Sequence, residues 1–518
     1  MRITSILIFA IDNGIFLFIT SKLRLCMTSI PKEERALVLQ GGGSLGAYEA
    51  GIFKAAYSFL KHKDKQEGNA GRAMCDIIAG TSIGAINSAI LVSHVVENKT
   101  WEGSAEKLIE FWNYISTEPI PKVFENYCMS WWNYFRNFNP YMGTAEAARR
   151  YYLTKQLLFI GAPKVFSLPH SEQDKKFFDL TNAWYRFDNE PLKKSLEVFA
   201  KFPIATRQED NQPRLLLTAV DVAEGFPVVF DSYPKNDGTR KTEYGRYIID
   251  KRISNDDEAE NTTEKEVGFE HILRYDKGIT ADHVIASAAV PVSYDYVKLE
   301  ADSYDPKTGN YQKKIRHFWD GGLLSNTPLI QLIASQRQYW YGVRGLKETL
   351  PKMTILIINL QPSRSDIIPW DKDGVQNRNM DITLSDRSKN DENAVLLLSD
   401  LVDLSKKILQ LAKENGVKPK LFDDLLDSRP ASHGRLHGIR SLRYRNMLEG
   451  QFNIGQIYRF ERKHDENAIS LKIMDFSSTT IKRLIQDGYN DGVDYVKAQF
   501  GNETVLAAGL ENQKENTS

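Results

Sequence analysis

The hydrophobic pattern of the first hundred residues changes period twice in the same way. Residues 35–40 read Arg-Ala-Leu-Val-Leu-Gln and predict a short strand, and apolar residues then recur at helical spacing over 52–59. The apolar run at 77–79 predicts a second strand, and helical spacing returns over 85–91. A tight segment containing glycine joins each strand to its helix. The chain therefore repeats the succession strand, turn and helix.

The middle of the chain has a more varied pattern. Residues 101–168 have helical spacing and many aromatic residues, which suits a helical core and also a helical cap over an acyl pocket; core packing is the simpler interpretation. Residues 214–221 and 227–230 predict a hairpin. Residues 232–267 are polar, and we expect a surface excursion there and no site.

The C-terminal third continues with both periods. Residues 363–393 are polar and predict a loop, and 394–415 predict an amphipathic helix with leucines along one side. Residues 456–461 and 469–474 predict a second hairpin, followed by a last helix. The tail of residues 501–518 is predicted to be disordered.

Composition limits the classes of protein that fit. The 518 residues include 67 Lys+Arg and 67 Asp+Glu, so the formal net charge is zero, and the hydrophobic content of 42% is that of an ordinary globular protein. This balance argues against a nucleic-acid partner or a polyanionic substrate. The three cysteines form no metal-binding or disulfide pattern, so a reducing, cytoplasmic location is expected.

Residues 1–33 are predicted to be an extension of the folded chain. Residues 3–25 are largely apolar, but Asp12 interrupts the run and no clear cleavage site with small residues follows. From Met27 the chain reads as the polar start of a cytosolic domain. We therefore favour a mis-set start codon or a poorly ordered extension over a membrane anchor or a signal peptide.

The second of the two turns carries a serine at its apex. It reads Gly80-Thr81-Ser82-Ile83-Gly84, the G-x-S-x-G pattern of a nucleophile elbow. Gly80 and Gly84 keep the neighbours of a sharp turn small, and the following helix would direct its N-terminus at an anion formed near Ser82. An ordinary turn with two glycines fits the pattern equally well, so this motif alone does not decide the function.

The first turn is a glycine loop. It reads Gly41-Gly42-Gly43-Ser44-Leu45-Gly46, and successive glycines there expose backbone amides that can face an anion. Gly41, Gly43 and Gly46 satisfy G-x-G-x-x-G, but a dinucleotide site also expects an acidic residue at the end of a second strand, where this chain has a polar loop. No Gly-Lys-Ser/Thr follows, as a nucleoside-triphosphate loop requires. The remaining interpretation is an oxyanion hole, in which the amides of Gly42 and Gly43 face a tetrahedral intermediate.

A third stretch supplies a carboxylate. A strand predicted over 314–319 ends in Asp320-Gly321-Gly322, and the carboxyl ends of strands are where α/β sheets place functional groups. A turn aspartate explains the same pattern. Ester hydrolysis needs a nucleophile, a base and a cradle for the oxyanion, and the three stretches together offer all of them.

The identity of the base leaves two possibilities. A triad in the order Ser, Asp, His would need His433, His437 or His464, and none of them lies in a convincing loop at a strand end. A dyad needs no histidine, because Asp320 would take the proton of Ser82 directly.

The three stretches resemble, in order and in context, the patatin-like phospholipases. The small residues of Ala286-Ser287-Ala288-Ala289-Val290-Pro291 also look like that family's helix before the Asp strand. The resemblance covers about residues 34–335. It implies an α/β fold, a three-layer α/β/α sandwich with a mainly parallel central sheet. Many members carry Arg or Lys where this chain has Leu45, which leaves the preference for a phospholipid headgroup open.

The resemblance also implies an activity, that of a serine lipid acyl hydrolase acting on carboxylic esters. It makes Ser82 the nucleophile, Asp320 the proton acceptor and the glycine loop the oxyanion hole, without metal or cofactor. The expected partner is a lipid or fatty acyl ester, with transient, peripheral contact at a membrane surface. The alternative is a catalytically silent module of the same fold that binds lipid or protein. The sequence leaves the oligomeric state open.

The expected organisation has four parts. An N-terminal extension spans 1–33, and a catalytic core spans 34–335, with the aromatic helical insertion near 101–168. A C-terminal extension packed on the core spans 336–500, and the tail follows.

Overall fold

A computed structural model of the chain describes residues 30–139, 142–168, 187–253, 262–428, 443–463 and 465–510. Residues 1–29 of the predicted extension and 511–518 of the predicted tail lie outside the described residues.

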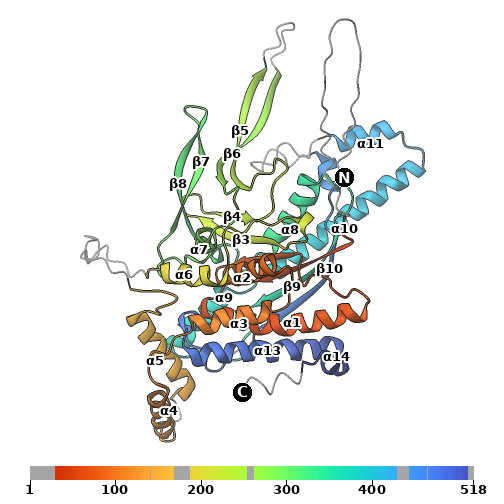
Figure 1. The fold of residues 1–518 in the computed structure, drawn as a ribbon. Helices are drawn as coiled ribbons and strands as arrows, with labels where there is room; N and C mark the ends of the chain where they lie inside the picture. Colours follow the sequence, from red (N-terminus) through yellow and green to blue (C-terminus); the bar gives the residue numbers. More distant parts are fainter. Residues whose placement is uncertain are drawn as a thin grey trace.

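One ten-stranded sheet runs through the protein (Figure 1). Its strands follow the order β10-β9-β1-β2-β3-β8-β7-β6-β5, and β4 pairs with β3 beside this path. The strands from β10 to β3 are parallel, whereas β3 to β5 form antiparallel pairs. Their bounds are β1 Glu33–Leu39, β2 Ile77–Thr81, β3 Arg214–Asp221, β4 Phe226–Asp231, β5 Lys241–Ile253, β6 Thr262–Arg274, β7 Val297–Asp305, β8 Asn310–Asp320, β9 Lys352–Asn359 and β10 Ile454–Glu461.

Helices cover both faces of the sheet. Their bounds are α1 Gly46–Gln66, α2 Ile83–Asn98, α3 Ser104–Ile115, α4 Lys122–Arg136, α5 Ala145–Ile160, α6 Glu190–Phe199, α7 Ala281–Ala288, α8 Leu329–Arg337, α9 Lys372–Thr383, α10 Ser388–Glu414, α11 Pro419–Leu426, α12 Tyr444–Leu448, α13 Ser478–Phe500 and α14 Asn502–Ala507. None of the described helices is both long and apolar enough to cross a bilayer.

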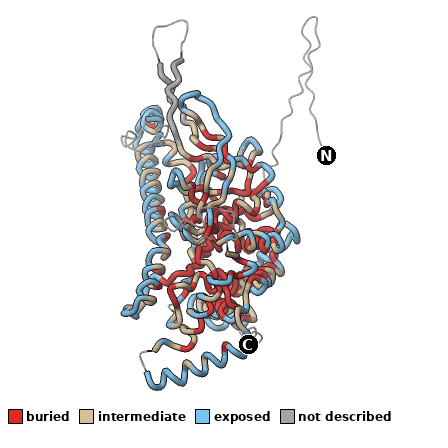
Figure 2. Tube along the Cα trace, turned by 90° about the vertical axis from the view of Figure 1, so that its left-hand side faces the viewer, coloured by how far each residue is buried: buried red, intermediate tan, exposed pale blue. Residues whose placement is uncertain are grey.

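Strand β1 explains why two helical layers form. Its residues are almost all buried, and successive side chains point to opposite faces of the sheet. Leu37 and Leu39 join the core that includes residues of α1, α2 and α13, while Ala36 and Val38 pack with residues of α8. Strands β9, β1, β2 and β3 of the parallel part of the sheet are thus buried on both sides, whereas most residues of β7 and β8 are exposed or partly exposed. Buried residues fill the centre of the molecule and exposed residues lie on its periphery (Figure 2). The predicted three-layer α/β/α sandwich is confirmed.

The C-terminal extension continues the sheet of the core. Strand β9 pairs in parallel with β1, and β10 pairs in parallel with β9. The predicted hairpin of 456–461 and 469–474 is therefore wrong. The second of these segments ends in a 3₁₀ turn, η7 Lys472–Met474, and the partner of β10 is instead β9, with a register shift between Ile454 and Ile457.

Three further segments differ from the prediction. The polar region 232–267, expected to be a surface excursion, contains β5 and the start of β6, which pair as a long hairpin; these strands carry many Lys, Glu and Thr residues and so have a weak hydrophobic period. The predicted loop 363–393 contains α9. The tail begins with α14, which is held because Val505 and Leu510 are fully buried and Tyr489 donates to the Leu510 carbonyl at 2.8 Å.

The aromatic region 101–168 divides between core and surface. Phe111 and Trp112 of α3 are fully buried, as core packing predicts. The aromatic residues of α4 are largely exposed, and this helix stands apart from the sheet beside α5 (Figure 1).

Helices α1 and α13 cross at Gly51 of α1 and Gly488 of α13, and this crossing gives a testable prediction. A Cβ on Gly488 would lie 2.1 Å from the carbonyl oxygen of Tyr48, so Gly488→Ala must push the helices apart. We expect a loss of about 1–3 kcal/mol in the free energy of unfolding, measured by denaturant titration, although Gly→Ala in a free helix gains roughly 0.5–1 kcal/mol. Gly492→Ala is the control, because its Cβ would crowd one methyl group, that of Ala55, and should cost less. Equal stabilities for the two variants would contradict the prediction.

Candidate active site

Ser82 lies between β2 and α2 in a strained backbone conformation. Its φ of 57° and ψ of −125° are rare for a residue with a side chain. The turn is tight: a Cβ on Gly84 would lie 2.4 Å from the Leu39 carbonyl oxygen, and one on Gly80 would lie 2.3 Å from that of Gly84. The two glycines of the motif are therefore required by the close approach of the chain to itself.

A serine on α7 holds this turn in place. Ser287 Oγ accepts a hydrogen bond from the Ser82 amide at 3.0 Å and donates to the Thr218 carbonyl at 2.6 Å. The hydroxyl of Thr81 donates to the Ser325 carbonyl at 3.0 Å. The sequence pattern does not assign Ser287 a role, although the residue stands in the small-residue stretch that resembles the family. Its hydroxyl within a run of alanines is the signal that marks it.

The sheet register brings Asp320 near Ser82. Thr81 pairs with Thr218 of β3, and the next residue of β3, Ala219, pairs with Asp320 at the end of β8. Ser82, which follows Thr81, and Asp320 therefore lie on the two sides of β3, at the carboxyl end of the parallel strands. The Asp320 amide donates to the carbonyl of Ala289, which fixes the end of β8 beside α7.

The Asp320 carboxylate is almost fully buried, with 4% of its surface exposed. Its Oδ1 accepts the Gly322 amide at 2.7 Å, and its Oδ2 accepts no hydrogen bond from the described residues. Burial raises the pKa of Asp320 to about 6, and the Ser82 hydroxyl and the Gly322 amide oppose this rise. The Ser82 hydroxyl is close enough to affect the pKa, but no hydrogen bond of good geometry joins the two side chains.

The glycine loop lies beside Ser82 and is held there by hydrogen bonds to Asn326. The Gly41 amide donates to the Asn326 carbonyl at 3.2 Å, and Asn326 Nδ2 donates to the Gly41 carbonyl at 3.1 Å. A Cβ on Gly41 would lie 2.9 Å from Ser82 Cβ, and one on Gly322 would lie 2.8 Å from Asn326 Oδ1. The structure therefore brings the three motifs together around Ser82, with Asn326, which we did not single out from the sequence, between them.

The rest of the loop rests on the C-terminal extension. Gly43 begins a 3₁₀ turn, η1 Gly43–Leu45, with a φ of 58°, and a Cβ there would lie 2.2 Å from the Ile473 carbonyl oxygen. Ser44 donates to the Lys472 carbonyl at 2.7 Å. Within the described chain, the amides of Gly42 and Gly43 donate to no other residue. Leu45 is fully buried in the core.

The remaining motif glycines allow close packing behind the site. Gly46 is the first residue of α1, where a Cβ would meet Ile83 at 2.6 Å. Its carbonyl accepts a hydrogen bond from Asn87, which also donates to buried Glu49 at 2.8 Å. Gly321 lies against β3, where an added Cβ would be 2.2 Å from the Thr218 carbonyl oxygen.

Histidines take no part in the described site. None of the described histidines forms a hydrogen bond with Ser82 or Asp320. His283, the nearest in sequence to Ser287, packs against Phe230, and burial lowers its pKa to about 4. His433, His437 and His464, which the triad alternative would use, lie outside the described residues.

Two large cavities lie elsewhere. One, of about 820 Å³, includes Asp76, which precedes β2, and Arg214, which begins β3, and so opens at the opposite end of these strands from Ser82. The other, of about 620 Å³, is lined by residues of α5 and α9. Neither is lined by Ser82 or Asp320.

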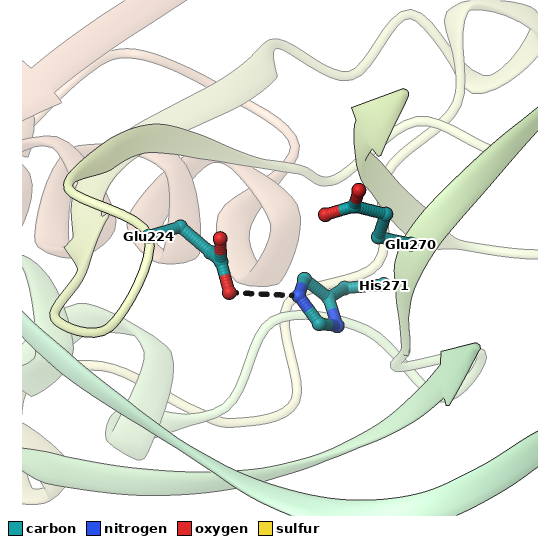
Figure 3. Close-up of side chains that lie close together, drawn as sticks. All are labelled: Glu224, Glu270 and His271. Carbon is teal, nitrogen blue, oxygen red and sulfur yellow. Dashed lines mark hydrogen bonds and ion pairs between the residues drawn. The ribbon is translucent and has the colours of Figure 1, made fainter. Parts of the chain in front are cut away.

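Among the described residues, one group of side chains lies close enough together to bind a metal ion: Glu224, Glu270 and His271 (Figure 3). His271 Nε2 lies 3.2 Å from Glu224 Oε1, and Arg316 donates to the same oxygen at 2.8 Å. A cation there would compete with the Arg316 guanidinium, which Glu224 shares with Asp221. We therefore interpret the cluster as a hydrogen-bonded brace between the β3–β4 turn and the long hairpin.

Comparison with known proteins decides the family. The family model described as Patatin-like phospholipase matches residues 37–333, more than half of the chain. The chain belongs to this family. Patatin-like phospholipases are lipid acyl hydrolases that act on lipid substrates, and the matched segment contains all three motifs. The solved structure of VipD from Legionella pneumophila is similar at a TM-score of 0.24 and 11% identity, covering 94% of this chain and 74% of that chain. No curated protein matches the sequence.

Burial of Asp320 predicts a pH-dependent cost in stability. The folded-state pKa of about 6 lies above the ordinary value of 3.8, so the folded protein holds the proton more tightly and loses stability as pH rises from about 4 to above 6. Asp320→Asn removes this cost and should raise the free energy of unfolding at pH 8 by about 3 kcal/mol. Denaturant titrations at pH 8 and pH 4 measure the effect, and the difference should shrink at pH 4. A variant that is less stable than wild type at pH 8 would contradict the prediction.

Proposed function

We propose that this chain hydrolyses carboxylic esters of fatty acids in lipids, with Ser82 as the nucleophile and Asp320 as the proton acceptor. The observation that carries the proposal is a strained serine at the end of β2 facing a buried carboxylate whose second oxygen accepts no hydrogen bond from the described chain. Family membership supports the lipid substrate class.

In the proposed first half-reaction, Asp320 removes the proton from the Ser82 hydroxyl as Oγ attacks the ester carbonyl carbon. The electron pair of the C=O bond moves to the carbonyl oxygen. When the tetrahedral intermediate collapses, the bond to the alcohol breaks and Asp320 returns the proton to the departing alkoxide. A base whose pKa is about 6 suits this task, because it is ionised at neutral pH yet still basic enough to accept the proton.

The glycine loop is the proposed oxyanion hole. The amides of Gly42 and Gly43 donate to no other described residue, so they are available to an oxyanion beside Ser82. The N-terminus of α2, which begins immediately after Ser82, adds a favourable dipole. In the second half-reaction a water molecule attacks the acyl-enzyme, Asp320 takes its proton, and the proton returns to Ser82 as the fatty acid leaves.

We further propose that residues 34–335 form the catalytic core and that the C-terminal extension stabilises it. Two observations support this division of roles. Lys472 and Ile473 of η7 contact the glycine loop, and Lys472 is itself held by an ion pair with Asp381 of α9. The extension would thereby fix the loop whose amides are proposed to bind the oxyanion.

The dyad makes a direct prediction for two substitutions. Ser82→Ala should lower kcat on a fatty acyl ester by at least about 10³-fold, because the nucleophile is lost, and should prevent labelling by a fluorophosphonate. Asp320→Asn should lower kcat by about 10²–10⁴-fold, the usual contribution of a general base, while lipid binding persists. Steady-state kinetics and activity-based labelling measure both.

Ser195→Ala is a matched control, since it removes another buried serine hydroxyl, one on α6 that donates to the Lys164 carbonyl, and leaves the dyad and the glycine loop intact. In the wild type, kcat/KM should fall below pH about 6, where Asp320 becomes protonated. If the wild type binds lipid but takes no fluorophosphonate label, the dyad is wrong and the silent binding module is favoured. If activity depends on His433 or His437, the triad replaces the dyad.

We propose α4 as the surface that contacts the lipid phase. Five exposed aromatic residues recur along one side of this helix and the residues that follow it, at intervals of three or four. They are Phe124, Tyr127, Trp131, Phe135 and Phe138, each with about half or more of its surface exposed. Trp and Tyr residues favour the interface of a bilayer, and a helix with one such face lies in that interface.

The charges of α4 fit the same surface. Its single acidic residue, Glu125, is buried and lies 3.3 Å from Arg149 of α5, so the exposed face carries no carboxylate that an anionic headgroup would repel. Lys122 and Arg136 stand near the two ends of the helix. This arrangement supports transient, peripheral contact with a membrane.

The double substitution Trp131→Ala/Phe135→Ala tests this contact. Binding to phosphatidylcholine vesicles, measured by co-sedimentation, should weaken about tenfold or more, because two aromatic side chains no longer enter the interface. Hydrolysis of a soluble short-chain ester should stay unchanged. Tyr311→Ala, which removes an exposed aromatic residue from β8, should bind as the wild type does. Unchanged vesicle binding by the double variant would refute α4 as the contact.

A further inference from the structure

Helix α10 has apolar residues on two opposite sides. The inner side faces the body: Val395 is buried with Leu332 of α8, and Lys406 and Asp403 bond to the Gln451 side chain. The outer side carries six exposed apolar residues, which we call the outer seam. They are Ala394, Leu397, Leu401, Leu404, Ile408 and Leu411.

The spacing of the outer seam is that of a coiled coil. Successive members are separated by three, four, three, four and three residues, which is the a/d repeat of a heptad. The five large side chains have 50–61% of their surfaces exposed. Leucines in this repeat pack best into a second helix lying alongside, since each fills a hole between four residues of the facing helix.

We propose that the outer seam pairs in antiparallel orientation with α10 of a second copy of this chain. In one antiparallel register every layer of the seam is apolar. Leu401 faces Leu404 of the second copy, Leu397 faces its Ile408, and Ala394 faces its Leu411. The two-fold axis repeats each of these contacts, so the interface is closed and pairs two copies only.

The charges beside the seam favour this orientation. Asp400 and Lys407 both precede an a position, so they flank the seam on the same side. In the antiparallel register Asp400 of each copy faces Lys407 of the other, which gives two ion pairs. In a parallel register Asp400 would face Ser405 and Lys407 would face Ala412, without any ion pair.

Both charges are available for such pairing. None of the ion pairs within the described chain involves Asp400 or Lys407, whereas Glu392, earlier in the same helix, is paired with Arg459. The C-terminal part of α10 extends away from the sheet towards α11 (Figure 1), and Lys413 to Leu421 are all exposed. A second helix therefore has access to the seam along its length.

Charge reversal in the full chain tests the pairing. By sedimentation equilibrium the wild type should form a dimer at micromolar concentration. Asp400→Lys or Lys407→Asp alone should raise the dimer Kd about tenfold or more, because each places like charges opposite one another twice. The double variant Asp400→Lys/Lys407→Asp should restore the wild-type Kd, a rescue that a merely structural role of either residue does not predict. Failure of the rescue would overturn the proposal.

Orientation is measured separately. Spin labels are placed at Glu414→Cys in a Cys26→Ser/Cys128→Ser background, since Cys75 is buried. The antiparallel register separates the two labels by about 35 Å along the helix axis, whereas a parallel pair holds them within about 15 Å. Double electron–electron resonance should give the longer distance. A monomeric wild type would also overturn the proposal and leave the seam to a helix of another protein.

Discussion

The backbone turn at Ser82 is the constraint around which the rest of the site is arranged. A residue with a side chain reaches φ 57° and ψ −125° only if its surroundings hold it there. Here the holding contacts come from α7, through Ser287, and from β1, against which Gly84 lies without a Cβ. The same turn sets the direction of the serine hydroxyl and the start of α2. Any change that relaxed it would move the hydroxyl and the helix dipole together.

Around this turn the sheet places a carboxylate that the fold would be more stable without. Asp320 is buried, and the contacts it makes do not offset the loss of water, so its pKa rises. Such a cost is common where a group must stay reactive. Ala219, the residue of β3 that pairs with Asp320, is small, which suits a place where two functional side chains approach across one strand.

The C-terminal extension belongs to the same structural unit as the core. Its strand β9 pairs with β1 along seven residues, and its turn η7 packs against the glycine loop. The loop is thus braced on two sides, by Asn326 of the core and by Ile473 of the extension. The surfaces proposed for lipid and for self-association, on α4 and α10, lie on separate helices of the periphery.

The sequence by itself determined the two strand–turn–helix units, the three motifs and the family, because glycine spacing and apolar period are local properties of the chain. It missed β10 as a parallel strand, since pairing with β9 is a contact between segments about a hundred residues apart. Likewise it could not select Ser287 or Asn326 from other small polar residues. Only the tertiary structure, which brings α7 and the end of β8 to the Ser82 turn, gives those two side chains their partners.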